Sequence, residues 1–337
     1  MRSAELETEP CDRERAAMKR VYLFVHIPKT AGTSFRKGLQ KNEMVRMLYD
    51  YGRDNPESTP ELLAADRPKL NAESEVFDPE KVNVICGHVN YRRYAHCVAP
   101  DAVFSIVRNP IERVVSEFQH LKRHANFPGD FAAFSASAAQ QNKQWGMLKG
   151  FRVEQGGLVG LTSHYKQFVE IFSELTGVAM ESISINKAPT SDAEERFSIS
   201  PQDVKAAYGQ NKRDLTFFFR QARGYLERVR SAGYNTAPKS GTTWNLRIDA
   251  GRRIVGWVPA GAKDCYFLLV KVNREQRVII ALDQERKDIV EKGLSESPMC
   301  GFSYPLSMLG AAPGDEVSVG LLGAPGFEKT LRVGSTS

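Results

Sequence analysis

The residues around Lys29 form the stretch of the sequence best suited to hold a charged ligand. Residues 28–34 read Pro-Lys-Thr-Ala-Gly-Thr-Ser and follow a short apolar run at residues 21–25. A buried strand, a loop of small residues and the start of a helix, in this order, bring backbone N–H groups and the positive end of a helix together. Lys29 adds a full positive charge, so the segment predicts a cradle for a phosphate-type group.

His88 and Arg108 each follow another predicted strand. His88 comes directly after the apolar run at residues 82–87, and Arg108 comes after the run at residues 102–107. In an open α/β sheet, ligands bind beyond the carboxyl ends of the strands. We therefore expect both side chains to lie near the loop at Lys29.

A helix is expected after Arg108, because Pro110 suits the first helical position. Arg113 and Ser116 lie three residues apart on this helix, roughly one turn from each other. Together with Arg108 they could hold a second phosphate group, although Arg113 could equally pair with a neighbouring glutamate.

Length and composition indicate an ordinary globular protein. The chain has 337 residues, of which 42% are hydrophobic and 26% charged, and this length suits about two domains. The formal charge of +6 suits an anionic ligand. A nucleic-acid partner is not expected, because the sequence has no long basic block, zinc-finger spacing or RNA-binding aromatic motif.

The cysteines and the N-terminus indicate a cytoplasmic protein. The five cysteines are scattered and form no CxxC pair, which favours reduced thiols and leaves one disulfide open. Residues 1–20 are charged and lack an apolar core, and no apolar run is long enough to span a bilayer. The histidines show no metal-ligand spacing, so no metal is expected.

Strands alternating with helices predict a P-loop-like, mainly parallel α/β sheet flanked by helices over residues 20–232. Residues 1–19 are expected to form a polar tail, and residues 53–74 a loop or lid. A short strand is expected at residues 182–185. Besides the helix at Pro110, the predicted helices cover residues 131–148, 163–175, 200–208 and 213–229.

The character of the sequence changes after a linker near residues 237–241. Short apolar or alternating runs then recur without a strong helix, and residues 273–276 form a hairpin turn between two of them. We predict a small all-β sandwich over residues 238–337. The expected strands cover residues 245–248, 254–258, 266–272, 277–281, 316–322 and 330–333.

In its two anion-binding segments the chain resembles the PAPS-dependent carbohydrate sulfotransferases, a group that includes heparan sulfate 2-O-sulfotransferase and related bacterial enzymes. PAPS is 3′-phosphoadenosine 5′-phosphosulfate, the sulfuryl donor. Residues 28–34 resemble the family's 5′-phosphosulfate loop. Residues 106–116, Ile-Val-Arg-Asn-Pro-Ile-Glu-Arg-Val-Val-Ser, resemble its 3′-phosphate motif, with Asn109 where aspartate is frequent. The resemblance covers roughly residues 20–230.

Three shorter segments add weaker similarity. Residues 87–89 resemble the segment that carries the histidine base of the 2-O-sulfotransferase branch. Residues 141–144 and 159–162 resemble further landmarks of the family. The C-terminal residues, from about 253, resemble accessory sandwiches of bacterial polysaccharide-biosynthesis proteins, from which no binding residues can be transferred.

The resemblance implies a role for each matching residue. Lys29 would stabilise the leaving phosphate, and His88 would take the proton from the acceptor hydroxyl. Arg108 and Ser116 would bind the 3′-phosphate of the donor. The donor-binding residues implied in this way are Lys29, Thr30, Ala31, Gly32, Thr33, Ser34, Arg108, Ser116, Asn186 and Lys187.

Several alternatives stay open. His26 or a carboxylate could replace His88 as the base. A P-loop kinase or other NTPase is disfavoured, because its motif places lysine after the glycines and its magnesium ion needs an aspartate at a strand end. A non-catalytic glycan-binding protein built on the same fold is a further alternative.

The resemblance thus implies a cytoplasmic, bacterial sulfotransferase that uses PAPS and no metal. Its acceptor would be a glycan involved in polysaccharide biosynthesis, and an acidic sugar is one candidate. Residues 91–94, His96 and residues 122–124 are candidate contacts for such a sugar. The sequence does not indicate the oligomeric state.

Overall fold

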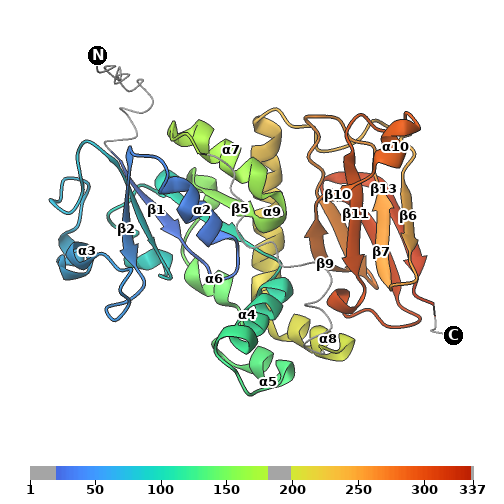
Figure 1. The fold of residues 1–337 in the computed structure, drawn as a ribbon, viewed down its shortest axis with the longest axis horizontal. Helices are drawn as coiled ribbons and strands as arrows, with labels where there is room; N and C mark the ends of the chain where they lie inside the picture. Colours follow the sequence, from blue (N-terminus) through green and yellow to red (C-terminus); the bar gives the residue numbers. More distant parts are fainter. Residues whose placement is uncertain (1–19, 181–198, 335–337) are drawn as a thin grey trace, which may run out of the picture.

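The computed structural model describes residues 20–180 and 199–334. An α/β unit comes first, and an all-β unit begins near residue 245 (Figure 1). The predicted strand at residues 182–185 and the candidate residues Asn186 and Lys187 lie outside the described residues. Within the described residues, no helix is both long and apolar enough to cross a bilayer.

A five-stranded sheet forms the centre of the α/β unit, and its strands follow the order β2-β3-β1-β4-β5. Every neighbouring pair is parallel, which confirms the predicted fold class. β1 and β4 are buried at every position, as expected for strands covered on both faces. The strands are β1 (Val21–Val25), β2 (Val45–Asp50), β3 (Val82–Gly87), β4 (Val103–Val107) and β5 (Leu158–Leu161).

The edge strands β2 and β5 were not expected from the sequence. β2 is only partly buried and contains Arg46, so it lacks the apolar run of a central strand. β5 is short and contains Gly160, where a Cβ atom would lie 2.3 Å from the Phe168 ring. Glycine is depleted in strands, yet here its missing side chain lets a helix pack closely on the sheet.

Helices flank the sheet and largely follow the expected pattern. Pro110 begins the long helix α4, and the side chains of Ser200 and Asp203 form a capping box at the start of α8. Gly177 ends α7 with a left-handed φ of 73°. The helices are α2 (Gly32–Leu39), α3 (Pro60–Ala64), α4 (Pro110–His124), α5 (Phe131–Ala136), α6 (Lys143–Met147), α7 (Tyr165–Thr176), α8 (Pro201–Gln210) and α9 (Lys212–Ser231).

The prediction of one helix over residues 131–148 is wrong. The chain leaves the helical conformation at Ser137 (ψ 140°), which ends α5. Asn142 then adopts a left-handed conformation (φ 52°), and α6 begins after it. Two short helices therefore replace one long one, and the break brings Gln144 and Lys143 to the end of the sheet where Arg108 lies.

The all-β unit contains two antiparallel sheets of four strands each, in the orders β10-β11-β7-β6 and β13-β12-β8-β9. Buried residues of both sheets belong to one hydrophobic cluster. Asn273 and Arg274, in the predicted hairpin turn, both have positive φ, as in a type I′ turn. The elements are β6 (Asn245–Ile248), β7 (Arg253–Trp257), β8 (Leu268–Val272), β9 (Glu275–Ile280), β10 (Gln284–Glu285), α10 (Lys287–Glu291), β11 (Met299–Pro305), β12 (Glu316–Leu321) and β13 (Ala324–Arg332). The resemblance of this unit to accessory modules stays a prediction.

The two units pack against each other through buried side chains. The ring of His164 stacks on Phe267 with 3.9 Å between ring centroids, and its Nε2 donates a hydrogen bond to the Tyr266 carbonyl at 3.0 Å. Phe267 and Leu269 belong to the hydrophobic core of the α/β unit. The β unit is therefore part of the core rather than a loosely tethered appendage.

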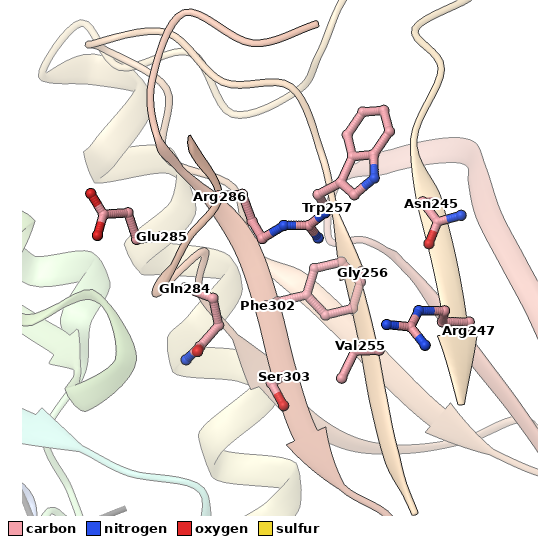
Figure 2. Close-up of a pocket in the computed structure, with 10 residues that line it drawn as sticks. All are labelled: Asn245, Arg247, Val255, Gly256, Trp257, Gln284, Glu285, Arg286, Phe302 and Ser303. Atoms are coloured by element: carbon pink, nitrogen blue, oxygen red, sulfur yellow. The ribbon is translucent and has the colours of Figure 1, made fainter. Parts of the chain in front are cut away.

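A pocket of about 310 Å³ lies on the sheet that contains β6, β7, β10 and β11. Figure 2 shows Trp257, Arg247 and Arg286 among its lining residues. None of the site residues predicted from the sequence lines this pocket.

Candidate active site

The loop between β1 and α2 contains two residues in left-handed backbone conformations. Lys29 has a φ of 67° and Ala31 a φ of 69°, and α2 begins at the next residue, Gly32. A non-glycine residue in this region costs roughly 1–3 kcal/mol, and such residues cluster at ligand-binding sites. The backbone N–H groups of the first helical turn have no partner within the helix, so they are suited to an anion in this loop.

The ring of His26 packs against this loop at Gly32. Its side chain is only 5% exposed, and its Nδ1 lies 2.8 Å from the Tyr51 hydroxyl. A Cβ atom on Gly32 would lie 2.1 Å from the imidazole Cδ2, so only glycine fits there. Burial, with a smaller contribution from His88, lowers the pKa of His26 to about 3, which keeps this imidazole neutral. These features are typical of a structural histidine.

Replacing Gly32 with alanine should disrupt the loop. The added methyl group overlaps the His26 ring, so we expect Gly32→Ala to lower the free energy of unfolding by about 1–3 kcal/mol in urea titrations. Gly209→Ala is the matched control, because a Cβ atom there meets no atom within 4 Å. That variant should be as stable as the wild type or slightly more so. Equal stability of the Gly32 and Gly209 variants would contradict the close contact.

The hydroxyl groups of the loop are not equally available. Thr30 is buried and its Oγ1 donates a hydrogen bond to the Ile27 carbonyl at 2.9 Å. Its hydroxyl proton is therefore used within the protein, and Thr30 can offer a ligand only its backbone N–H. Ser34 is also buried, whereas Thr33 is partly exposed.

Lys29 and Arg108 come together at the ends of the adjacent strands β1 and β4. Nη1 of Arg108 lies 3.5 Å from the Lys29 carbonyl oxygen. Burial is the main cause that lowers the pKa of Lys29, with Arg108 acting in the same direction and Glu117 opposing it. The two predicted anion-binding segments therefore form one positively charged site.

Four hydrogen bonds hold Arg108 in place, one of which is the long contact from Nη1 to the Lys29 carbonyl. Its Nε donates to Glu112 Oε2 at 3.0 Å, one helical turn along α4. Its backbone N–H donates to Gln144 Oε1 at 2.9 Å, and the Gln144 amide donates to the Arg108 carbonyl at 2.8 Å. Since Nε, the backbone and one N–H of Nη1 are used, Nη2 and the second N–H of Nη1 remain for a ligand.

Ser116 lies on the same face of α4, because it follows Glu112 by four residues. Its side chain is partly exposed and makes no hydrogen bond within the described part of the chain. Arg113, by contrast, is fully buried and donates from Nη2 to the Gln140 carbonyl at 2.9 Å. The expectation that Arg113 helps to hold a phosphate is wrong, since its guanidinium group is turned into the core.

His88 follows β3 and is exposed to solvent. Its ring packs edge-on against His26 and Tyr51, with centroid distances of 4.6 and 4.8 Å. Burial, followed by the positive charge of Lys143, lowers the pKa of His88 to about 4, and Glu117 opposes this shift. Solvent contact reduces the effect, but its direction keeps the imidazole neutral at pH 7, as a general base must be.

Comparison with known protein families identifies the family of this chain. A model of the sulfotransferase family matches residues 16–192, which is more than half of the 337 residues. The chain belongs to the sulfotransferase family. No curated protein sequence matches it.

Two solved structures show weak similarity to the chain. Mouse sulfotransferase SULT7A1, complexed with PAP, is 13% identical with a TM-score of 0.37, over 63% of this chain and 83% of that one. A sulfotransferase from Alicyclobacillus acidocaldarius is 18% identical with a TM-score of 0.33, over 62% of this chain and 94% of that one.

Glu117 and Lys143 of this sulfotransferase were not expected at the site. Glu117 Oε2 is buried without a hydrogen bond to any described residue. Its charge opposes the lowering of the pKa of Lys29, His88 and Lys143. Lys143 lies in the segment 141–144, whose family resemblance was the only sequence signal for it. Glu117 follows Ser116 directly, but nothing in the sequence distinguishes it from an exposed helical glutamate.

The β unit of the sulfotransferase reaches the same site. The Tyr304 hydroxyl donates to Glu112 Oε1 at 2.9 Å, while the other oxygen of Glu112 accepts from Arg108. Asn109 caps α4 by accepting from the Ile111 N–H at 3.0 Å, and its side-chain amide donates to the Arg277 carbonyl. Glu112 therefore connects the β unit to Arg108.

Removing the Tyr304 hydroxyl should weaken donor binding. Without this hydroxyl, the Glu112 carboxylate loses one of its two partners and can move. The Arg108 guanidinium group, which binds the same carboxylate, is then held less firmly. We expect Tyr304→Phe to bind adenosine 3′,5′-bisphosphate (PAP) roughly threefold to tenfold more weakly in calorimetry, the range of one lost hydrogen bond. Tyr266→Phe is the control, because its hydroxyl donates to Asp264 within the β unit at 2.7 Å. If both variants bind PAP equally, Tyr304 does not position Arg108.

Proposed function

We propose that this sulfotransferase moves a sulfuryl group from PAPS to a hydroxyl group of a carbohydrate. One observation carries the proposal: Arg108 Nη1 lies 3.5 Å from the carbonyl of Lys29. A loop that binds one phosphate suits many nucleotides. A second cationic group directly beside it suits a nucleotide with an additional phosphate, and the 3′-phosphate distinguishes PAPS from ATP.

The donor fits the residues present. The loop places the N–H groups at the start of α2 beside Lys29, and Gly32 lacks the side chain that would displace the supporting ring of His26. Lys29 would contact the oxygen that bridges sulfur and phosphorus and stabilise the charge that develops on the leaving 5′-phosphate. The terminal nitrogens of Arg108 and the hydroxyl of Ser116 would bind the 3′-phosphate.

His88 would act as the general base. It takes the proton of the acceptor hydroxyl while that oxygen forms its bond to sulfur, and the bond between sulfur and the 5′-phosphate oxygen breaks in line. The products are a sulfated acceptor and PAP. No described group of three or more His, Cys, Asp or Glu residues could hold a metal ion.

Most of the side chains after His88 that were predicted to contact the acceptor bind other residues of the protein instead. Arg93 Nε pairs with Asp50 at 2.5 Å, and the Tyr94 hydroxyl donates to the same carboxylate at 2.6 Å. His96 Nε2 lies 2.5 Å from the Arg67 carbonyl. Of this group Arg92 is the residue whose charge remains exposed and unpaired among the described residues. A carbohydrate acceptor thus rests on the family resemblance rather than on this segment.

The kinase alternative is weaker than the proposed transfer. Asp50 does end strand β2, where a magnesium-binding carboxylate would be expected, but it is 1% exposed and binds Arg93 and Tyr94. β4 is followed by Arg108 instead. Lys29 also precedes the glycine of its loop, unlike the lysine of a P-loop NTPase.

Calorimetry with PAP and AMP tests the donor. We expect PAP to bind much more tightly than AMP, because only PAP carries a 3′-phosphate for Arg108. Arg108→Ala should lose about 10- to 100-fold in PAP affinity and little in AMP affinity, as expected for a charge-assisted contact. Lys29→Ala should weaken binding of both ligands. Equal affinity of the wild type for PAP and AMP would refute PAPS as the donor.

Turnover of His88→Ala tests the base. We expect this variant to lose about 10²- to 10⁴-fold in kcat and to retain its PAP affinity. For the wild type, kcat/KM should be constant from neutral pH to well below pH 6.5 and decrease as the pH approaches the lowered pKa of His88, about 4, because a protonated imidazole cannot accept a proton.

Gln202→Ala serves as the control for the histidine variant. Gln202 is an exposed residue in the first turn of α8 and should be dispensable for turnover. Wild-type turnover in His88→Ala would assign the base to another residue while leaving the donor proposal intact.

A further inference from the structure

A basic groove of about 500 Å³ lies beside helices α6 and α9, which contact each other in the α/β unit (Figure 1). Its walls carry five exposed cationic side chains from two separate segments of the sequence, residues 149–152 and helix α9. These are Lys149, Arg152, Lys212, Arg213 and Arg220. No acidic residue lines the groove.

The positive charges of the groove are mostly unpaired. Arg220 forms an ion pair with Glu154 at 2.6 Å. The other four cations form no ion pair with any described residue. Like charges gathered in a concave surface repel one another and attract an anion strongly. The pocket in Figure 2 differs, because Glu285 lines it and Asp288 pairs with its Arg286 at 2.7 Å.

An aromatic side chain holds two of these cations at the groove. Lys149 Nζ lies 5.1 Å and the guanidinium carbon of Arg213 5.0 Å from the centroid of the Trp145 ring. Cation–π contacts of this kind restrict long flexible side chains. Phe151 and Leu148, both buried, add apolar surface to the lining. The groove is therefore organised by packing and is not a run of independent solvated charges.

Two connections link the groove to the candidate active site. Helix α6 begins at Lys143, whose charge acts on His88, and continues through Gln144, which binds the backbone of Arg108. Trp145 follows directly and lines the groove. In addition, Arg92, which follows His88 by four residues, lies beside Gly150 of the groove. A Cβ atom on Gly150 would be only 3.2 Å from Nε of Arg92. Arg92 thus extends the basic surface toward the base.

We infer that this groove binds an anionic stretch of the acceptor glycan, on sugar rings that carry sulfate or carboxylate groups and neighbour the ring that reacts. The identity of the ligand as acceptor rests on the proposed function. A single phosphate would be satisfied by one or two cations. Five cations spread over two segments suit a chain that repeats its anionic groups, and the apolar lining suits the faces of sugar rings.

Binding of a fluorescently labelled heparin octasaccharide tests this inference. The groove variant combines Lys149→Gln, Arg152→Gln and Arg213→Gln. We expect it to bind the octasaccharide about tenfold more weakly than the wild type, since each exposed ion pair contributes modestly. The matched control combines Lys239→Gln, Lys263→Gln and Lys292→Gln, which removes the same charge from exposed positions elsewhere. It should bind like the wild type.

Three outcomes would overturn the inference. These are an equal loss of affinity in the control variant, unchanged affinity in the groove variant, and equally tight groove-dependent binding of single-stranded DNA of matching charge. The last result would indicate a general polyanion site. PAP calorimetry on the same variants separates the two proposals, because the groove substitutions should leave PAP affinity unchanged. Lys29→Ala should in turn lose PAP binding and retain the octasaccharide.

Discussion

The site depends on holding two positively charged side chains close together despite their mutual repulsion. Lys29 and Arg108 come from the ends of neighbouring strands and meet at a backbone contact of 3.5 Å, although both are positive. The parallel sheet supplies the proximity, and the carboxylates of Glu112 and Glu117 offset part of the repulsion. Such preorganisation is useful for catalysis, because groups that are already fixed need no rearrangement when charge develops on a leaving phosphate.

The β unit belongs to this arrangement. Its Phe267 enters the core of the α/β unit, and its Tyr304 holds one oxygen of Glu112. A unit joined only by a linker would leave that carboxylate free to rotate. The structure instead gives Glu112 one partner in each unit, so the orientation of Arg108 depends on side chains almost two hundred residues away. The two units therefore share both a hydrophobic core and a hydrogen-bonded contact at the site.

Local patterns predicted the centre of the fold and the proximity of Lys29 and Arg108. The apolar runs before His26, His88 and Arg108 are buried parallel strands, and their ends meet as the topology of open sheets requires. The edge strand at residues 45–50 was missed because it is partly exposed and does not show an apolar run. The sequence did not reveal that Arg113 is buried. Helical spacing shows which residues share a face of a helix, but it does not show which face packs against the core. The contact of Tyr304 with Glu112 joins distant segments, and no local signal predicts such a contact.

Asn109 connects the two units, and an aspartate at this position could not make the same connection. Its oxygen caps α4, and its amide nitrogen donates to the Arg277 carbonyl in the β unit. An aspartate, frequent at this position in the family that the chain resembles, would cap the helix equally well. Its second carboxylate oxygen, however, would face the Arg277 carbonyl oxygen. Neither oxygen could donate a hydrogen bond to the other, and both carry negative charge. The helix cap is therefore matched to the docked β unit, and an aspartate-capped relative is not expected to accept this unit in the same orientation.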